Sequence, residues 1–276
     1  QINHGMAEHS ARYDRFACAL VKAGFAVFAH DHRGHGQTKA PDAPLGVFAK
    51  TNGFDKVVED VLAVNRHIKS RVEVPVICFG HSMGSIIGLN FAMRHPQEIV
   101  GLVCWNAGVE TGGLAAISRI ILGAEGVIRG RNSPSGLANK LTFQAWNKVF
   151  APNRTDYDWL SRDEAEVDKY VADPLCGFQV STGLWLDLIR GVYFGAEDAH
   201  LAKLVQDLPV HLQGGAQDPC SNKGRDMVHL SERMARAGMI DVTLNIIADT
   251  RHESLNEVNR DQTTGEFIRW LSERFA

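Results

Sequence analysis

Residues 74–94 read VPVICFGHSMGSIIGLNFAMR, and this stretch decides the fold. The apolar run 74–79 is typical of a buried strand, and the apolar residues that follow Gly84 recur at helical spacing. Between them stands G-H-S-M-G, with Ser82 at its centre. A serine on such a sharp strand-to-helix turn exposes its Oγ, and both flanking positions need glycine because a side chain would clash there. The pattern predicts that Ser82 is a nucleophile at the edge of a sheet.

Further apolar runs and helical patterns alternate on both sides of this stretch. Short continuous apolar strands separated by helices indicate a mostly parallel sheet that helices cover on both faces, so we predict the α/β class. The predicted strands are 26–30, 74–79, 100–105, 210–212 and 244–247, and helices are expected at 11–21 and 256–275.

The alternation stops in the middle of the chain. Residues 115–128, 137–150 and 178–194 have helical patterns, and no strand pattern lies between them. A helical insertion of this kind is expected to cover the carboxyl ends of the strands, where ligands bind in open α/β sheets. We therefore expect a core made of residues 1–108 and 203–276, and a helical cap or lid at 109–202.

A serine hydroxyl is a poor nucleophile without a base, and the base needs an acid to hold its tautomer. On a strand–serine–helix scaffold the chain order is serine, acid, histidine. Asp218 follows the predicted strand 210–212, and His252 follows the predicted strand 244–247. Both belong at the same sheet edge as Ser82, which predicts a triad of Ser82, Asp218 and His252. Asp249 and Glu253, nearer to His252 in sequence, are the alternative acids.

Two backbone N–H groups are expected to stabilise the oxyanion that forms when the serine attacks. The first belongs to Met83, the residue after the nucleophile, at the positive end of a helix. The second is expected from the loop after an early strand at residues 1–3, which nominates Met6.

Several motifs occur together in one order: H-G-M-A-E-H-S at 4–10, D-H-R-G-H-G at 31–36 and G-H-S-M-G at 80–84. With D-P-L at 173–175, D-P at 218–219 and R-H-E at 251–253, they resemble the monoglyceride lipase and lysophospholipase group of α/β-hydrolases, of the serine aminopeptidase type and in its bacterial form. The resemblance covers nearly the whole chain, although such proteins carry further strands ahead of H-G-M. It implies the α/β-hydrolase fold, hydrolysis of single-chain lipid esters (monoacylglycerol or lysophospholipid) through an acyl-enzyme, and no cofactor.

Several further side chains are expected to contact the substrate. The motifs at 4–10 and 80–84 and the end of the strand 100–105 lie at the predicted sheet edge. The apolar helical stretch 115–128 of the cap is expected to receive the acyl chain or to touch a membrane transiently. The expected substrate-binding residues are His4, Gly5, His81, Asn106, Ile117 and Ile121.

Composition excludes several classes of protein. A formal net charge of -3 leaves no basic excess for nucleic acid, and no apolar run is long enough to span a bilayer. The five cysteines form no C-x-x-C pair, which favours free thiols in a reducing, cytoplasmic location, with membrane association through the cap left open. Because the chain begins at Gln1, within the strand expected at residues 1–3, we expect a segment upstream of it.

Three other functions compete with the lipid esterase. A peptidase or amidase would need an acidic group for a substrate amine, for which Glu110, Asp187 or Glu197 could serve. A binding protein could retain the fold without catalysis, although the intact triad argues against it. A metallohydrolase could use the histidines at positions 30, 32 and 35, but Gly34 stands where its acidic ligand belongs, so we expect no metal.

Overall fold

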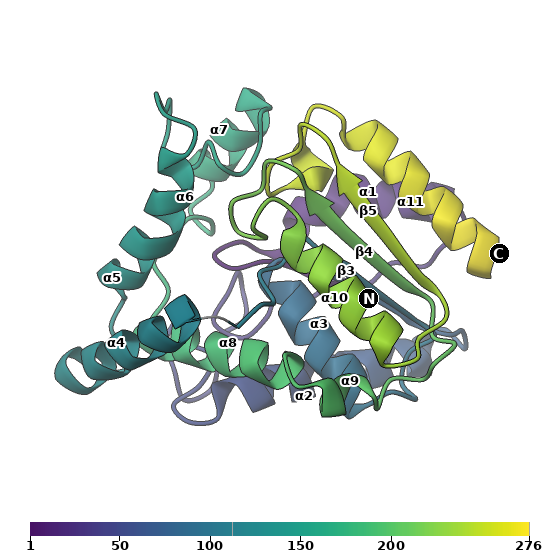
Figure 1. The fold of residues 1–276 in the computed structure, drawn as a ribbon, viewed down its shortest axis with the longest axis horizontal. Helices are drawn as coiled ribbons and strands as arrows, with labels where there is room; N and C mark the ends of the chain where they lie inside the picture. Colours follow the sequence, from purple (N-terminus) through teal and green to yellow (C-terminus); the bar gives the residue numbers. More distant parts are fainter. Residues whose placement is uncertain (112, 276) are drawn as a thin grey trace.

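The computed structural model describes residues 1–111 and 113–275. Within these residues, parallel strands form one five-stranded sheet whose spatial order follows the chain (Figure 1). The prediction of a parallel α/β sheet is confirmed. The strands are β1 (Ile2–Asn3), β2 (Ile77–His81), β3 (Gly101–Trp105), β4 (Val210–Gly215) and β5 (Val242–Ile247).

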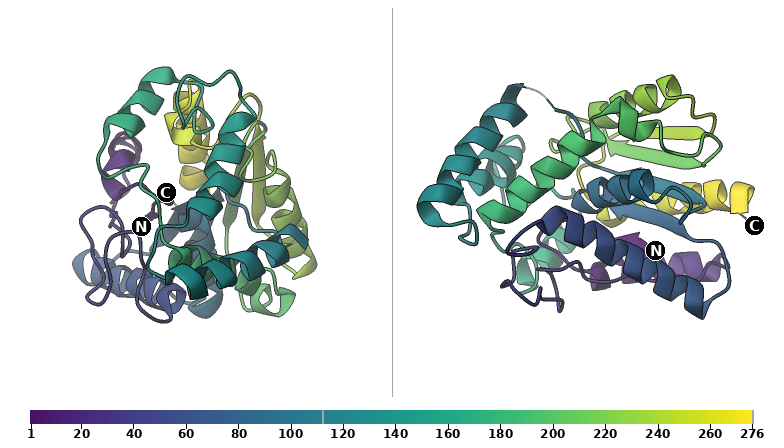
Figure 2. Two further views of the ribbon diagram at one scale, coloured as in Figure 1. Left: turned by 90° about the vertical axis from the view of Figure 1, so that its left-hand side faces the viewer. Right: turned by 90° about the horizontal axis from the view of Figure 1, so that it is seen from below.

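Helices cover both faces of the sheet, as Figures 1 and 2 show. Side chains alternate along β2, so that Cys78 joins the larger apolar cluster on one face and Phe79 joins a second cluster on the other. The first cluster includes residues of α2 (Gly53–Arg71), α3 (Met83–Arg94) and α10 (Arg225–Arg236), and the second includes residues of the 3₁₀ helices η1 (Ser10–Tyr13) and η3 (Ser254–Asn256), α1 (Asp14–Lys22) and α11 (Arg260–Phe275).

Two strand predictions differ from the structure. A full strand at 26–30 is wrong, because its neighbour β1 has two residues and Ala29 forms only an isolated parallel bridge with Ile2. The strand predicted at 74–79 begins later, at Ile77. Pro75 has no N–H to donate, and Val74 before it is exposed.

Residues 109–202, which we call the cap segment, form helices and loops in their described part, with one isolated bridge between Pro134 and Ser181. Most of these helices stand to one side of the sheet (Figure 1). The helix α7 was not predicted, although Asp163 caps it by accepting hydrogen bonds from the N–H groups of Ala165 and Glu166. The helices are α4 (Gly113–Arg129), α5 (Gly136–Asn139), a π-helical turn (Lys140–Gln144), α6 (Ala145–Lys148), α7 (Glu164–Ala172), α8 (Thr182–Gly195) and α9 (Asp198–Leu201).

The cysteines are all free thiols. Cys78 and Cys104 are buried on β2 and β3, and burial raises the pKa of Cys78 to about 11, which keeps that thiol protonated. None of the helices in the described ranges combines the length and the apolar character needed to cross a bilayer.

A buried histidine makes the sheet sensitive to acid. The indole N–H of Trp105 on β3 donates to Nδ1 of His211 on β4 at 3.0 Å, which requires a neutral imidazole. Burial lowers the pKa of His211 to about 3. In the unfolded chain the pKa is about 6.5, so the stabilisation is present above that pH and is lost as the pH falls from about 6.5 towards 3.

We therefore expect the free energy of unfolding to fall by about 1 kcal/mol per pH unit below pH 6 through this group. Urea unfolding at a series of pH values measures the slope. In His211→Asn the amide oxygen can still accept from Trp105 but does not titrate, so the slope should be shallower. An equal slope in both proteins would show that His211 does not carry the effect.

Candidate active site

Ser82 stands on the turn between β2 and α3, as predicted. Its backbone has φ 55° and ψ −120°, a conformation that residues other than glycine rarely adopt. This sharp turn exposes the Oγ at the edge of the sheet. A Cβ at Gly80 would collide with the backbone of Gly84, and one at Gly84 would collide with the carbonyl of Asn3. The two glycines therefore permit the close approach of β2, α3 and the end of β1.

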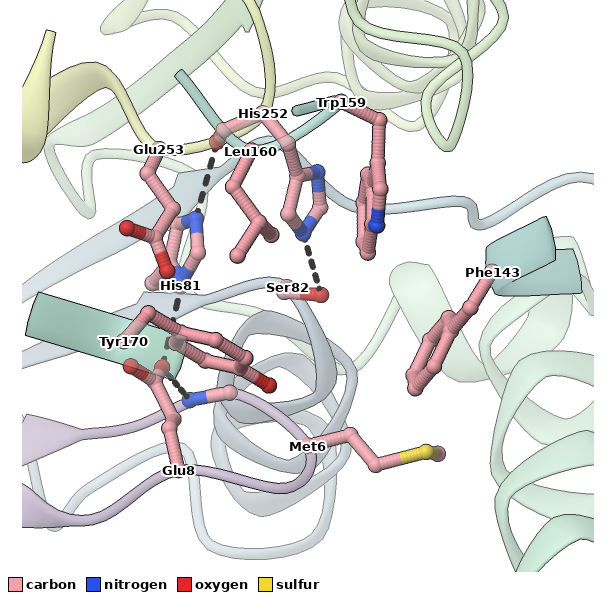
Figure 3. A pocket seen from close by; sticks show the side chains of 11 residues that line it. Met6, Glu8, His81, Ser82, Phe143, Trp159, Leu160, Tyr170, His252 and Glu253 are labelled. Atoms are coloured by element: carbon pink, nitrogen blue, oxygen red, sulfur yellow. Dashed lines mark hydrogen bonds and ion pairs between the residues drawn. The ribbon is translucent and has the colours of Figure 1, made fainter. Parts of the chain in front are cut away.

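Ser82, His252 and Asp218 form one chain of hydrogen bonds. The Oγ of Ser82 lies 2.9 Å from Nε2 of His252, and Nδ1 of His252 lies 3.0 Å from Oδ1 of Asp218 (Figure 3 shows the first of these contacts). With Nδ1–H donating to the carboxylate, Nε2 is free to accept the serine proton. The residues come from the carboxyl ends of β2, β4 and β5, which is why distant segments of sequence meet here.

Asp218 is completely buried and accepts several further hydrogen bonds. They come from the hydroxyl of Ser221 at 2.6 Å, the N–H of Cys220 at 2.9 Å and the amide of Asn106 at 3.3 Å. Burial alone would raise the pKa of Asp218, but His252 and these donors together lower it below its ordinary value. Asp218 is therefore held as a carboxylate facing His252.

The alternative acids have other partners. Asp249 accepts a hydrogen bond from Gln217 at 3.1 Å on the surface. Glu253 pairs through both of its carboxylate oxygens with the guanidinium of Arg12. Of the three acids considered from sequence, Asp218 is the one hydrogen-bonded to His252.

The loop that carries Met6 is held by a buried carboxylate. Glu8 accepts hydrogen bonds from the N–H of Gly5 and, at 2.8 Å, from the hydroxyl of Tyr13, and it pairs with Arg12. Burial alone would raise the pKa of Glu8, but Arg12 and His81 hold it well below its ordinary value. This carboxylate holds the turn at Gly5, the residue before Met6, next to Ser82.

His81 links this loop to the loop that carries His252. Its Nε2 lies 3.0 Å from the backbone oxygen of His252, and its Nδ1 lies 3.6 Å from Oε1 of Glu8 (Figure 3). Burial would lower the pKa of His81, but the Glu8 carboxylate raises it. The two sides of the site are thereby connected through one imidazole.

Met83 begins α3, so its N–H is among the first helical N–H groups, which have no acceptor within the helix. Met6 lines the cavity that contains Ser82. A Cβ at Gly5 would lie 3.4 Å from the Cβ of Ser82, so the loop passes directly beside the serine. The two predicted oxyanion donors therefore come from segments that adjoin the Oγ.

A cavity opens at Ser82. Of the predicted substrate-binding residues, Gly5 and His81 line it. The cap segment contributes aromatic and aliphatic side chains that face Ser82 in Figure 3. The residues that line the cavity are Gly5, Met6, Glu8, His81, Ser82, Phe143, Trp159, Leu160, Tyr170, His252 and Glu253.

Four predicted substrate-binding residues do not line this cavity. His4 is fully buried, and its Nε2 accepts from the N–H of His32 at 2.9 Å. Asn106 is also buried, between Asp218 and the hydroxyl of Ser254. Both therefore support the site from behind. Ile117 and Ile121 are 54% and 39% exposed on α4, so contact of that face with a membrane stays a prediction.

His30, His32 and His35, weighed above as metal ligands, pack closely, and burial lowers the pKa of each. The centroids of His30 and His32 lie 4.8 Å apart, and burial lowers the pKa of His30 to about 4 and that of His35 to about 3. In the described ranges, the one trio with ligand atoms all within 4.8 Å of one another is His9, Asp173 and Cys176. That trio does not include His30, His32 or His35.

The cap segment is tied to the His252 loop, and we call these contacts the cap tether. The N–H of Glu253 donates to the carbonyl of Leu160 at 2.8 Å. Arg251 donates to the carbonyl of Ser161 at 3.1 Å, and the hydroxyl of Ser161 donates to the carbonyl of Asn256 at 2.8 Å. The part of the cap that covers the site is therefore bonded to the loop that carries the base.

Sequence analysis missed several residues of the site. Glu8 lies within the motif H-G-M-A-E-H-S, and Arg12 follows that motif. The short spacing from Gly5 to Glu8 is the sequence feature that could have indicated the bond between them. Ser221 follows Asp218 at a spacing typical of a side chain that bonds within a turn. Trp159 and Leu160 lie in an irregular loop, which carries no periodicity, and nothing in the sequence showed which face of the helical segments would bring Phe143 and Tyr170 to the cavity.

The strand–serine–helix turn and the hydrogen-bonded serine, histidine and aspartate on a parallel sheet define an α/β-hydrolase. Residues 1–259 match the serine aminopeptidase family S33. Rat monoglyceride lipase is 31% identical over 285 residues, covering 100% of this chain and 82% of the relative, and human monoglyceride lipase is 31% identical over 286 residues with the same coverage. The chain therefore belongs to the serine aminopeptidase S33 family, in the group that resembles monoglyceride lipases, and it is a hydrolase.

Solved structures agree with this assignment. A lipase in an open form is 26% identical, with a TM-score of 0.85, and the match covers 99% of this chain and 89% of the lipase. A thermostable carboxyl esterase from Bacillus coagulans has a TM-score of 0.87 at 23% identity, covering 100% and 89% of the two chains. The second likeness shows the fold alone.

Proposed function

We propose that this protein is a serine esterase that hydrolyses carboxylic esters of single-chain lipids, such as monoacylglycerols, through an acyl-enzyme. The observation that carries the proposal is the series of hydrogen bonds from Ser82 through His252 to Asp218. Ser82 and His252 line a cavity whose other walls are partly apolar. The similarity to rat and human monoglyceride lipases supports the substrate class.

In the first step, His252 Nε2 takes the proton of Ser82 as the Oγ attacks the ester carbonyl. The N–H groups of Met6 and Met83 stabilise the negative charge that develops on the carbonyl oxygen. Removal of one such donor typically costs about 3–4 kcal/mol of transition-state stabilisation. His252 then gives the proton to the leaving alcohol oxygen, and the acyl group stays on Ser82.

In the second step, His252 takes a proton from water, and the hydroxide equivalent attacks the acyl carbonyl. The same two N–H groups stabilise the second tetrahedral intermediate. Its collapse returns the proton to Ser82 and releases the fatty acid. Throughout, Asp218 holds the imidazole in one tautomer and stabilises its cation.

The cavity favours an ester over a substrate with a free amine. The carboxylates on its wall, Glu8 and Glu253, share the guanidinium of Arg12, and their oxygens also accept hydrogen bonds from Gly5, Tyr13 and Asn256, so they are already engaged within the protein. Asp187, considered for that role from sequence, lies outside the lining beside Arg131. The apolar surfaces of Phe143, Trp159 and Leu160 suit an acyl chain.

The test is hydrolysis of p-nitrophenyl esters of increasing chain length by the purified protein, with and without EDTA. We expect a maximum at medium or long chains and no effect of EDTA. A fluorophosphonate probe should also add its phosphonyl group to the peptide that contains Ser82, detected by mass spectrometry. Inert protein, or a label elsewhere, would exclude the serine mechanism. Loss of activity in EDTA would favour the metallohydrolase instead.

A further inference from the structure

Three side chains of the kinds that bind metal ions meet where the cap segment contacts the loop of the 4–10 motif. A ring nitrogen of His9, a carboxylate oxygen of Asp173 and the thiol sulfur of Cys176 all lie within 4.8 Å of one another. His9 belongs to the core, and the other two follow α7 in the cap segment. The three are not among the residues that line the cavity at Ser82, and the proposed reaction does not use them.

A single turn presents Asp173 and Cys176. Residues 173–176 read D-P-L-C, and the N–H of Cys176 donates to the carbonyl of Asp173 at 3.0 Å, which closes the turn with Pro174 at its favoured second position. The N–H of Leu175 donates to Oδ1 of Asp173 at 2.8 Å. Oδ2 is left to face His9, whose Nε2 lies 2.7 Å away. Two ligands separated by two residues on one turn, with an outer hydrogen bond that orients one of them, are typical of protein metal sites.

The donor set suits zinc. Imidazole nitrogen, carboxylate oxygen and thiolate sulfur are the atoms that bind Zn²⁺ in proteins, and three such ligands leave the fourth tetrahedral position to water. Thiolate and imidazole also disfavour Mg²⁺ and Ca²⁺, which take oxygen ligands. At metal–ligand distances of about 2.0–2.3 Å the ligand atoms of a tetrahedral site lie roughly 3.3–3.6 Å apart, so His9 and Asp173 need to separate by about 1 Å or less.

The surroundings of the trio admit a cation. The side chains of His9 and Asp173 are 12% and 29% exposed, and the thiol is partly exposed as well, so an ion can enter from solvent. The positive charge of Arg12 acts on this cluster, but its guanidinium is shared between the carboxylates of Glu8 and Glu253. Arg12 therefore adds little repulsion for a bound cation.

We propose that His9, Asp173 and Cys176 bind a zinc ion that clamps the cap segment to the loop of the 4–10 motif. The ion would reinforce an existing contact, because the hydroxyl of Tyr170 donates to the carbonyl of Ala7 at 2.9 Å. On binding, the thiol releases its proton to solvent, and a tautomer change moves the proton of the His9 ring from Nε2 to Nδ1. The ion contacts no reacting atom, so it holds the cap and does not take part in ester hydrolysis.

The test uses the full chain after EDTA treatment and dialysis, with Co²⁺ as a spectroscopic probe and Zn²⁺ as the competing ion. We expect one Co²⁺ per chain, with a thiolate-to-metal charge-transfer band that Zn²⁺ abolishes. Zn²⁺ should also raise the Tm, because only the folded chain brings the three ligands together. Cys176→Ser should abolish the band. Cys176→Ser and His9→Gln should each weaken Zn²⁺ binding at least about 100-fold, since loss of an outer partner alone costs about 10–100-fold.

Cys18→Ser is the matched control, because Cys18 is an exposed thiol 4.0 Å from a carboxylate oxygen of Asp14. It should keep the wild-type band and affinity. A band that survives in Cys176→Ser and disappears in Cys18→Ser would overturn the proposal, as would folded wild-type protein that binds no Zn²⁺ at millimolar concentration. If His9→Gln does not fold, Asp173→Asn keeps an oxygen to accept from the turn and should weaken binding equally. Failure to cleave esters would overturn the proposed function alone, since the readouts here are metal binding and Tm.

Discussion

Ser82→Ala should lower the rate of ester hydrolysis by about five to six orders of magnitude. The residual activity would come from substrate binding and from the backbone N–H groups that stabilise the oxyanion. The Oγ 2.9 Å from His252 Nε2 is the only atom in this chain of hydrogen bonds that can form the acyl-enzyme. Alanine also removes the site of phosphonylation. Burst kinetics with a p-nitrophenyl ester and mass spectrometry of the probe-treated protein measure both effects.

Ser70→Ala is the control for this substitution, because Ser70 is exposed at the end of α2 and contacts only the carbonyl of His67 among the described residues. It should keep the wild-type rate and the label on Ser82. A thermal melt of each variant separates loss of chemistry from loss of folding. A Ser82→Ala protein that is folded and retains a tenth of the activity would rule out Ser82 as the nucleophile.

Asp218→Asn should lower kcat by about four orders of magnitude with little change in KM. The asparagine amide can donate to Nδ1 of His252, which would place the imidazole proton on Nε2 and leave that atom unable to accept from Ser82. The cation formed in the transition state would also lose its carboxylate. Because the carboxylate is fully buried and accepts from Ser221 and Cys220, stability should be measured alongside by urea unfolding.

Asp249→Asn separates Asp218 from the nearby alternative acid. Asp249 is bonded to Gln217 at the surface, so its loss should leave kcat within about twofold of wild type. If Asp249→Asn were the more damaging of the two variants, Asp249 would be the acid that supports His252 during turnover. Equal, small effects would instead point to catalysis without a carboxylate.

Local pattern was enough to predict the sheet and the position of the serine. The apolar run before Gly80 indicates the strand, and the helical spacing after Gly84 indicates the helix. The two glycines of the motif indicate the tight turn between them, where a Cβ would clash. The acid and the histidine followed from strand order, because a parallel sheet brings all its carboxyl ends to one edge. The failed strand at 26–30 shows the limit of the method: an apolar run forms a strand only where a neighbour is long enough to pair with it.

Contacts between segments that are distant in sequence were not predictable. Ile117 and Ile121 had the right chemistry for an acyl-binding wall, but in the folded chain they are partly exposed on α4 and do not line the cavity at Ser82. The cavity instead uses Trp159 and Leu160 from an irregular loop, whose position depends on tertiary contacts. His4 looked like a ligand-binding residue because it stands beside Gly5, yet both its ring nitrogens are used by the backbone.

The cap tether limits how this enzyme could be recombined with its relatives. Leu160 and Ser161 accept hydrogen bonds from the two residues on either side of His252, so the boundary between cap and core is not a free joint. Both acceptors are backbone carbonyls, so a chimaera with a foreign cap would keep these bonds only if its chain placed carbonyl oxygens where those of Leu160 and Ser161 lie, and a mismatch would disturb the loop that carries His252. Whole-cap exchange is therefore expected to succeed where the imported chain follows the same backbone path at positions 160–161, while point changes in the cap leave the tether intact.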